Sequence, residues 1–234
     1  NAMIVIIQWV MELAPYGVAA LVAEVIGTSG VSVLTALLAY AGTVLLGLAI
    51  HAGIVYGGMV RFIGRIPWGS FMRAARPAQL IAFSTSSSSA TLPVSMECAE
   101  KNIGVSKPVA SFVLPLGSTV NMDGTALYQG VAAIFIAQVF QTDLSLGSQL
   151  SIVLAATMAS IGAAGVPGAG MITLALVLTS TGIPTVGLAL ILGVDRILDM
   201  FRTAVNVTGD LAVTTVIATS EGEELQLNSS SSDS

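Results

Sequence analysis

A line of polar side chains lies inside a stretch, Val186 to Ala218, that is long and apolar enough to cross a bilayer. Its members are spaced 4, 3, 4 and 4 residues apart: Asp195, Asp199, Arg202, Asn206 and Asp210. At about 100° per residue, this spacing puts all five on one helical face within an arc of roughly 80°. The four ionisable side chains would together cost roughly 10 kcal/mol at mid-membrane on insertion scales. We therefore expect compensating groups or a ligand against this face, and a self-paired structural network is the alternative.

The composition is typical of a polytopic membrane protein. The 234 residues are 54% hydrophobic and 9% charged, with a mean hydropathy of +0.89, whereas a soluble domain carries about 25% charged residues. No basic patch or aromatic stacking surface indicates a nucleic-acid partner. Cys98 is the single cysteine, so the sequence offers neither an intrachain disulfide nor a cysteine-based metal cluster.

The N-terminal part predicts two spanning helices. Residues 1–2 precede Met3 and are typical of a tag remnant, and no signal peptide follows. The first span, within residues 1–30, ends at the Gly27–Gly30 turn, and the second covers 31–60. His51 in the second span is expected to pack or to form an interhelical hydrogen bond more often than to bind a ligand.

The next segment, 77–106, predicts a re-entrant hairpin. Six of the eight Lys and Arg residues flank it or lie near its ends, so the positive-inside rule puts both ends on the cytoplasmic side. Its middle, IAFSTSSSSATLP at 81–93, is too polar and too short for a lipid-facing crossing. A serine-rich tip inside the protein fits better, because non-helical backbone can be satisfied there. A flexible serine linker is the alternative.

Two further interrupted segments follow. The span 108–140 is broken at Asn121–Thr125, where unwound backbone and the Asp123 carboxylate offer oxygen ligands suited to a hard cation such as sodium. In 148–181, five glycines or prolines fall within 162–170 and predict a second re-entrant hairpin, entering from outside. A kinked pair of ordinary helices is the alternative. The polar helix 184–218 then returns to the cytoplasm, and an acidic tail at 219–234 is expected to be disordered.

This layout predicts an all-α polytopic membrane protein whose two re-entrant helical hairpins form an inverted repeat. A hairpin tip followed by a polar, broken helix occurs twice, and the two hairpins open to opposite sides. Paired interrupted hydrophobic segments of this kind indicate a transporter binding site.

Four motifs resemble the glutamate/aspartate transporter family, the dicarboxylate/amino acid:cation symporters. They are SSSSATLP at 86–93, PLGSTVNMDGTALYQG at 115–130, SIGAAGVPGAG at 160–170 and DRILDMFRTAVNVTGD at 195–210. The likeness runs from about Met11 to Ala218 and begins at what resembles the family's fifth transmembrane helix, so the first four have no counterpart here. It implies that 1–30 belongs to a scaffold and 31–218 to a mobile transport domain. It also implies a homotrimer for the full-length protein and a multi-pass location in the cell (inner) membrane.

The resemblance implies roles for the substrate-binding residues. Asp199 would pair with the α-amino group, Arg202 with the side-chain carboxylate and Asn206 with the α-carboxylate. Thr125 would contact the distal acid. The remaining substrate-binding candidates are residues of the two hairpin tips and one neighbour on the last helix: Ser87, Ser88, Val166, Gly170 and Thr203.

The resemblance also implies sodium as the coupling ion and no other cofactor. One site would take backbone oxygens of Gly117, Asn121 and Asn206 with the Asp210 carboxylate. A second would take the carbonyls of Thr119, Ser160, Ile161 and Ala163. A third would use the 121–123 break with residues of a helix that has no counterpart here. The further candidates for these sites are Thr119, Met122, Asp123, Ser160, Ile161 and Ala163.

The predicted function is sodium-coupled symport of acidic amino acids by alternating access. Arg202 suits a carboxylate and Asp199 an ammonium group one turn away. Archaeal relatives carry an arginine where this chain has Ser86, and Arg196 is not at the position that animal relatives use. Gln129 replaces the glutamate of proton-coupled animal members, which favours sodium coupling alone.

Other functions remain open on the sequence. A C4-dicarboxylate or a neutral amino acid could be the substrate, although a dicarboxylate offers Asp199 no ammonium partner. The chain could be a non-transporting fragment. An intramembrane enzyme using Asp195 and Asp199 as an acid pair is a third possibility, but such proteases need aspartates from two helices and no second motif is present.

Overall fold

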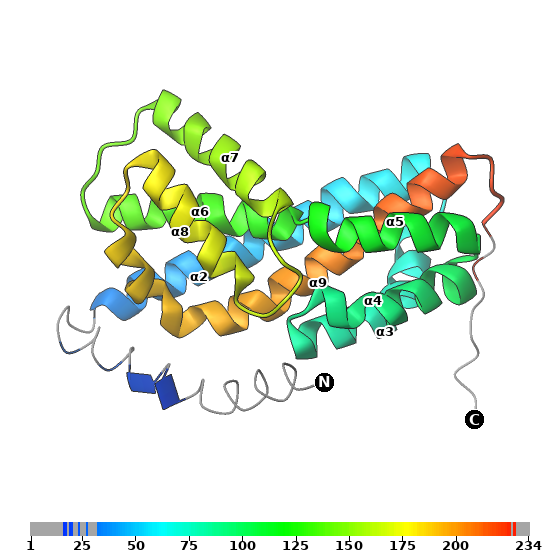
Figure 1. Cartoon of the computed structure of the whole chain (residues 1–234), viewed down its shortest axis with the longest axis horizontal. Coiled ribbons are helices and arrows are strands. Elements are labelled where there is room, and N and C mark those ends of the chain that lie inside the picture. The colour runs from blue at the N-terminus through cyan, green and yellow to red at the C-terminus, as the bar shows by residue number, and fades with distance from the viewer. Residues whose placement is uncertain are drawn as a thin grey trace.

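The structure is a computed structural model that describes residues 32–225 continuously. It also describes Leu227 and, nearer the N-terminus, Tyr16, Gly17, Ala19, Ala20, Ala23 and Gly27. The described part is built from helices joined by short connections (Figure 1). The predicted scaffold helix at 1–30, with its tag remnant, lies outside the continuously described residues, and so does the end of the predicted tail at 228–234.

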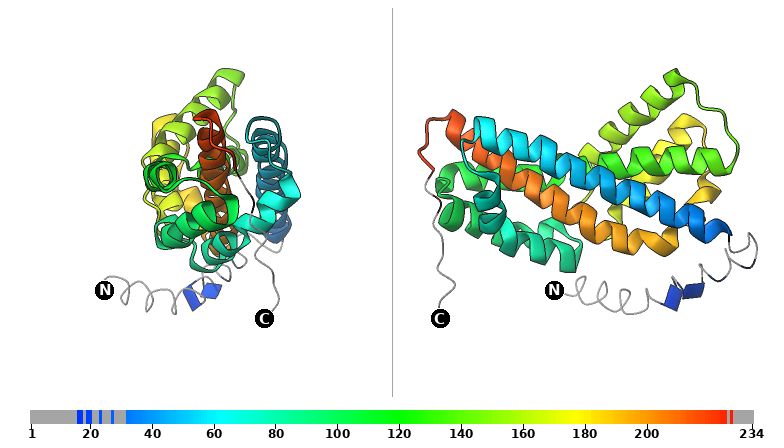
Figure 2. Two further views of the ribbon diagram at one scale, coloured as in Figure 1. Left: turned by 90° about the vertical axis from the view of Figure 1, so that its right-hand side faces the viewer. Right: turned by 180° about the vertical axis from the view of Figure 1, so that it is seen from behind.

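The first long helix runs along the molecule and consists of three consecutive elements. These are α2 (Ser32–Ile50) and the π-helical turns η1 (His51–Tyr56) and η2 (Met59–Ile63). Among the described residues, Leu34–Ile63 is the one helical stretch long and apolar enough to cross a membrane by length and composition. It packs against α9 (Leu188–Ser220) and α6 (Asp123–Val139), and Figure 2 shows it running beside α9. Leucines such as Leu38 are exposed on its other face. Such an apolar face needs lipid or another protein surface to cover it.

The serine-rich segment forms a pair of packed helices. The first arm is α3 (Trp68–Thr85), and the second consists of α4 (Ser88–Glu97) and the π-helical η3 (Cys98–Ile103). The first arm begins well before the predicted start at residue 77, because Pro77 lies inside α3 rather than at its beginning. Only Ser86 and Ser87 separate α3 from α4, so the serines make a tight turn and not a flexible linker.

The remaining elements follow the predicted interruptions. The helices α5 (Lys107–Val120) and α6 are separated by Asn121 and Met122, where the sequence predicts the break. A second packed pair consists of α7 (Leu146–Ile161) and α8 (Ala169–Thr181), joined by residues 162–168. A short 3-10 turn, η4 (Thr185–Gly187), leads into α9.

Two apolar cores divide the molecule along its length. One core joins α3, α4, η3 and α5 to the C-terminal half of α9, around residues such as Phe71 and Leu211. The other joins α2, α6, α7 and α8 to the N-terminal half of α9, around Ile136 and Leu174. The helix α9 therefore contributes to both cores, and Figure 1 shows it running along the molecule. Its polar residues and the two helix-pair tips meet between the cores.

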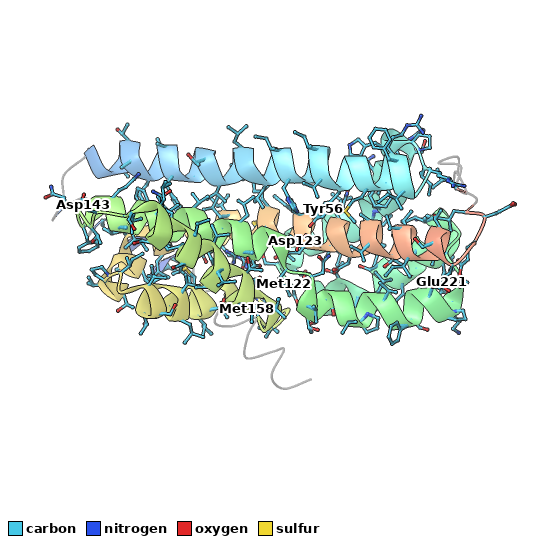
Figure 3. The ribbon with its side chains drawn as sticks, turned by 90° about the horizontal axis from the view of Figure 1, so that it is seen from above. Tyr56, Met122, Asp123, Asp143, Met158 and Glu221 are labelled. Atoms are coloured by element: carbon cyan, nitrogen blue, oxygen red, sulfur yellow. The ribbon has the colours of Figure 1, made fainter. Side chains whose placement is uncertain are left out.

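This junction lies far from both ends of the molecule. Figure 3 places Asp143 and Glu221 at opposite ends of the long axis, with Tyr56, Met122 and Asp123 near its middle. If the long axis crosses the bilayer, the junction lies at mid-membrane depth.

The described part of the tail is attached to the helices, so the prediction of disorder from residue 219 is wrong for 219–225. The helix α9 continues to Ser220. The Glu223 carboxylate accepts hydrogen bonds from the backbone N–H of Ser106, at 2.9 Å, and from its hydroxyl. Leu225 and Leu227 pack against the first core. Because Ser106 precedes α5, this carboxylate also faces the positive end of a helix dipole.

Candidate functional site

The polar face of α9 is buried along its whole length. Each of its five predicted members is at most 6% exposed, and Arg202 is only 2% exposed. The spacing-based prediction that these residues share one inward face is therefore confirmed. Buried charges at this density must be compensated by partners, and the helices packed around α9 supply them.

Arg202 is compensated by two carboxylates and an aromatic ring. Its Nη2 donates to Asp199 Oδ1 at 2.6 Å, and its Nη1 lies 3.6 Å from Asp195 Oδ1. The guanidinium carbon lies 4.1 Å from the centre of the Tyr128 ring on α6, a cation–π distance. Nη1 makes no hydrogen bond to the residues that the structure describes, so this side of the guanidinium can still donate to a ligand carboxylate. The self-paired network considered from the sequence is thus present but incomplete.

Asp199 connects α9 to the second helix pair. Its Oδ1 accepts the hydrogen bond from Arg202 Nη2, and its Oδ2 accepts one from the backbone N–H of Gly168 at 2.9 Å. Gly168 has a φ of +77° and directly precedes α8, which has no side-chain cap. The carboxylate therefore binds the N-terminal end of α8, where helix N–H groups lack intrahelical acceptors.

Asn206 joins α9 to the break between α5 and α6. Its Oδ1 accepts the N–H of Gly124 at 2.8 Å, and its Nδ2 donates to Thr125 Oγ1 at 3.1 Å. A Cβ on Gly124 would lie 2.9 Å from the same Oδ1. A glycine is therefore required beside Asn206, and the break presents Thr125 to α9.

The two tips close a small polar cavity over these residues. Its volume is about 20 Å³. Eight of the nine predicted substrate residues line it: Ser88, Thr125, Val166, Gly170, Asp199, Arg202, Thr203 and Asn206. Gly170 lies against the guanidinium, because a Cβ there would come within 2.7 Å of Arg202 Nη2. The ninth, Ser87, is buried at the first tip but does not line the cavity.

Three of the predicted sodium residues gather one turn further along α9. Asp210 Oδ1 accepts Asn121 Nδ2 at 3.0 Å, and a Cβ on Gly117 would lie 2.8 Å from the same oxygen. Since α5 ends at Val120, the carbonyls of its last turn lack the usual helical donors, although the Gly117 carbonyl accepts the Asn121 N–H at 2.8 Å. A carboxylate, an amide and backbone carbonyls are hard oxygen donors, and this donor set fits sodium.

Asp123 faces a different neighbourhood. Its Oδ2 accepts the Tyr56 hydroxyl at 3.0 Å and lies 3.4 Å from His51 Nε2, both on η1 (Figure 3). His51 thus makes the interhelical contact that the sequence favours for it. The other sodium candidates lie near the tips. Met122 and Ala163 line the cavity, and Thr119 is on α5 with Ser160 and Ile161 at the end of α7, which packs against α5.

Comparison with known proteins agrees with this arrangement. The model of the sodium:dicarboxylate symporter family matches residues 1–220. The chain belongs to the sodium:dicarboxylate symporter family. It is 46% identical to excitatory amino acid transporter 1 of Mus musculus over 90% of this chain and 39% of the relative. It is 44% identical to excitatory amino acid transporter 3 of Homo sapiens over 97% and 43%.

A third relative is named for its ion dependence. The chain is 46% identical to a Caenorhabditis elegans protein named as a sodium-dependent excitatory amino acid transporter, glt-4, over 94% of this chain and 45% of the relative. The chain thus spans less than half the length of the curated relatives it matches. This is a family of symporters and not of enzymes, which removes the intramembrane-enzyme alternative.

Several residues of this family member contribute to the site although the sequence reasoning did not assign them there. Ser86 lines the cavity with a buried hydroxyl that has no hydrogen-bond partner. The sequence feature that could have indicated Ser86 is its position, since archaeal relatives carry an arginine there. Tyr128 lies one turn after Thr125 on α6, and that spacing could have placed it beside the site. The amide of Gly168 left no signal in side-chain chemistry.

Gln129 and Arg196, noted as departures from the family pattern, have different surroundings. Gln129 is fully buried, and its Nε2 donates to the Gly170 carbonyl at 3.3 Å and to the Thr173 hydroxyl, tying α6 to α8. Arg196 is half-buried, and its Nη1 has no hydrogen-bond partner. Arg196 is not among the described residues that line the cavity.

Proposed function

We propose that this chain forms the transport domain of a sodium-coupled symporter of acidic amino acids, aspartate or glutamate. The observation that carries the proposal is the buried Arg202–Asp199 pair beside a cavity that Thr125 and Asn206 also line. A guanidinium whose Nη1 makes no hydrogen bond to the described residues suits a side-chain carboxylate, and a carboxylate one turn away suits an α-amino group. The names of the relatives support the same substrate class.

The helix pairs take the roles of two re-entrant hairpins in this proposal. The pair α3–α4 is the first and the pair α7–α8 the second, and each is followed by an interrupted or polar helix, as an inverted repeat requires. Ser88 on one side and Val166 and Gly170 on the other close over the substrate. Residues 31–218 would move as one transport domain against a scaffold that includes 1–30.

Sodium binding would favour closure of the site. Asp210, Asn121 and Gly117 supply one ion site with the Asn206 carbonyl, and Thr119, Ser160, Ile161 and Ala163 supply carbonyls for a second. Asp123 and Asn121 would contribute to a third. Gln129 cannot carry a proton, which supports coupling to sodium alone. The intact protein is expected to be a homotrimer in the cell membrane.

The test is calorimetry of the intact protein with aspartate, glutamate, succinate and serine, with and without sodium. We expect Arg202→Ala to abolish aspartate binding while sparing weak binding of neutral amino acids, because the guanidinium recognises only the second carboxylate. Arg73→Ala, at an exposed arginine on α3, is the control. Unchanged aspartate affinity in Arg202→Ala would contradict the assignment of Arg202 as the partner of the side-chain carboxylate.

A second variant tests the ion site in the same experiment. Asp210→Asn removes the carboxylate charge but keeps the size of the side chain. We expect it to raise the sodium concentration needed for aspartate binding. An unaltered sodium dependence would remove Asp210 from the ion site.

A C4-dicarboxylate is the second candidate substrate, because the family takes its name from dicarboxylates. Asp199 argues against it, since a dicarboxylate would place a second negative group near that carboxylate. Succinate binding as tight as aspartate binding would favour this candidate.

A further inference from the structure

The tips of the two helix pairs are hydrogen-bonded to each other through one carbonyl group. The Gly165 oxygen accepts the Ser87 hydroxyl at 2.7 Å and the Ser89 backbone N–H at 3.1 Å. The Ser87 hydroxyl oxygen also accepts the backbone N–H of Ala90 at 3.1 Å, and this hydrogen bond caps α4. The Ser87 hydroxyl therefore has both a donor and an acceptor partner, and Ser87 itself does not line the cavity.

Gly165 fits this contact only because it has no side chain. A Cβ there would lie 2.5 Å from Ser89 Oγ, 3.0 Å from Ser89 N and 3.1 Å from the Ser118 carbonyl oxygen. The residue is buried, its carbonyl binds the first tip, and the space that a side chain would take is filled by Ser89 and by Ser118 near the end of α5. Such close approach of backbones is available to glycine and not to larger residues.

The contact lies on the wall of the cavity, which Gly165 lines. A volume of about 20 Å³ holds about one water molecule. An amino acid can therefore enter or leave only when the tips separate, and separation breaks both hydrogen bonds to the Gly165 oxygen.

We propose that Ser87 and Gly165 form a latch that holds the second tip closed on the first. In this role Ser87 is a positioning residue that sets how long a substrate stays bound, and it is not a substrate ligand. Ser88, and Ser86 with its unpartnered buried hydroxyl, remain the first-tip serines that face the cavity. The inference rests on the proposed function only for the identity of the substrate.

The test compares Ser87→Ala with Ser145→Ala in the intact protein. Both serines cap a helix by accepting a backbone N–H three residues on, but only Ser87 also donates to Gly165. We expect Ser87→Ala to speed aspartate dissociation about three- to tenfold in stopped-flow measurements, the scale of one net hydrogen bond, with association changed less than about twofold. Ser145→Ala should leave both rates unchanged. Equal dissociation rates in the two variants would overturn the latch.

A second measurement needs no substrate. Spin labels at Ala90→Cys and Ala164→Cys, two exposed tip positions, report the distance between the tips in a cysteine-free background. We expect Ser87→Ala and Gly165→Ala to broaden and lengthen this distance, and Gly130→Ala, where a Cβ meets nothing within 4 Å, to leave it unchanged. An unchanged distance in Gly165→Ala contradicts the latch. If the distances respond but the wild type binds no acidic amino acid, the latch stands and only the proposed substrate falls.

Discussion

The two helix pairs have the same outline but are held in different ways. The first turns in two residues, Ser86 and Ser87, and its second arm is capped by the Ser87 side chain. The second turns through residues 162–168 and enters α8 from Gly168 without a side-chain cap. Its arms also leave more apolar surface uncovered, with Leu150 and Ile172 both more than 70% exposed.

This difference indicates which pair is fixed and which can move. The first tip caps its own helix, because the Ser87 hydroxyl oxygen accepts the Ala90 N–H. The second tip takes its cap from elsewhere, because the Gly168 N–H binds Asp199 on α9. Any ligand group that competes for Asp199 therefore also acts on the start of α8. We expect the second pair to be the one that opens.

The strongest test of this contrast is Gly170→Ala on the second pair. The added Cβ would lie 2.7–3.0 Å from three atoms of the buried Arg202 guanidinium, so either the arginine or α8 must shift. We expect aspartate affinity to fall by about 100-fold or more, since small displacements of a binding group have large effects. Gly130→Ala is the matched control for adding a methyl group within a helix. Calorimetry showing wild-type affinity in Gly170→Ala would mean that the second tip is not close-packed on Arg202.

A smaller effect is expected at the base of the first pair. Glu223 ties the end of α9 to Ser106, which follows the second arm. We expect Glu223→Ala to lower the free energy of unfolding by about 1.5–3 kcal/mol, the range for hydrogen bonds to a charged group. The control is Glu221→Ala, an exposed carboxylate on the same segment. Equal thermal-unfolding midpoints for the two variants would show that the first pair is not anchored at its base.

The smallest effects are expected from substitutions within the two turns, Gly168→Ala in the second and Ser86→Gly in the first. Gly168→Ala puts a side chain at a φ of +77°, a strain of about 1–2 kcal/mol, and should weaken substrate binding about fivefold or more through the second tip. Ser86→Gly relieves a φ of 52°, but the added chain entropy of glycine, about 0.5–1 kcal/mol, offsets most of that gain. We expect Ser86→Gly to change the unfolding free energy by less than about 1 kcal/mol. If Ser86→Gly changed the unfolding free energy more than Gly168→Ala, the assignment of the first turn as fixed and the second as mobile would be reversed.

The helical face of α9 and the interruptions at 121–125 and 162–170 were predictable because periodicity and glycine content are local properties of the sequence. The beginning of α3 was not, since Pro77 and the nearby arginines are compatible with both a helix and a loop until the first core packs. The same holds for Glu223, whose hydrogen bonds to Ser106 join residues far apart in the chain.

Within the site, the side chains with unusual chemistry for a membrane helix could be named from the sequence. Contacts made by backbone atoms could not. The Gly168 amide and the Gly165 carbonyl have no side chain to indicate them, and their roles depend on which segment faces them. Ser87 illustrates the limit: four consecutive serines are chemically alike, and only the turn geometry separates those that face the cavity from the one that holds Gly165.

Asn206 has a consequence for the energetics of the proposed transport cycle. One amide touches Gly124 and Thr125 with its side chain, while its residue lies one turn from Asp210 on α9. A cation and a substrate that share this residue cannot bind independently. Thermodynamic reciprocity then requires that sodium raise the affinity for substrate by the same factor by which substrate raises the affinity for sodium. A substitution at Asn206 should therefore change this common factor, and not only the two separate affinities.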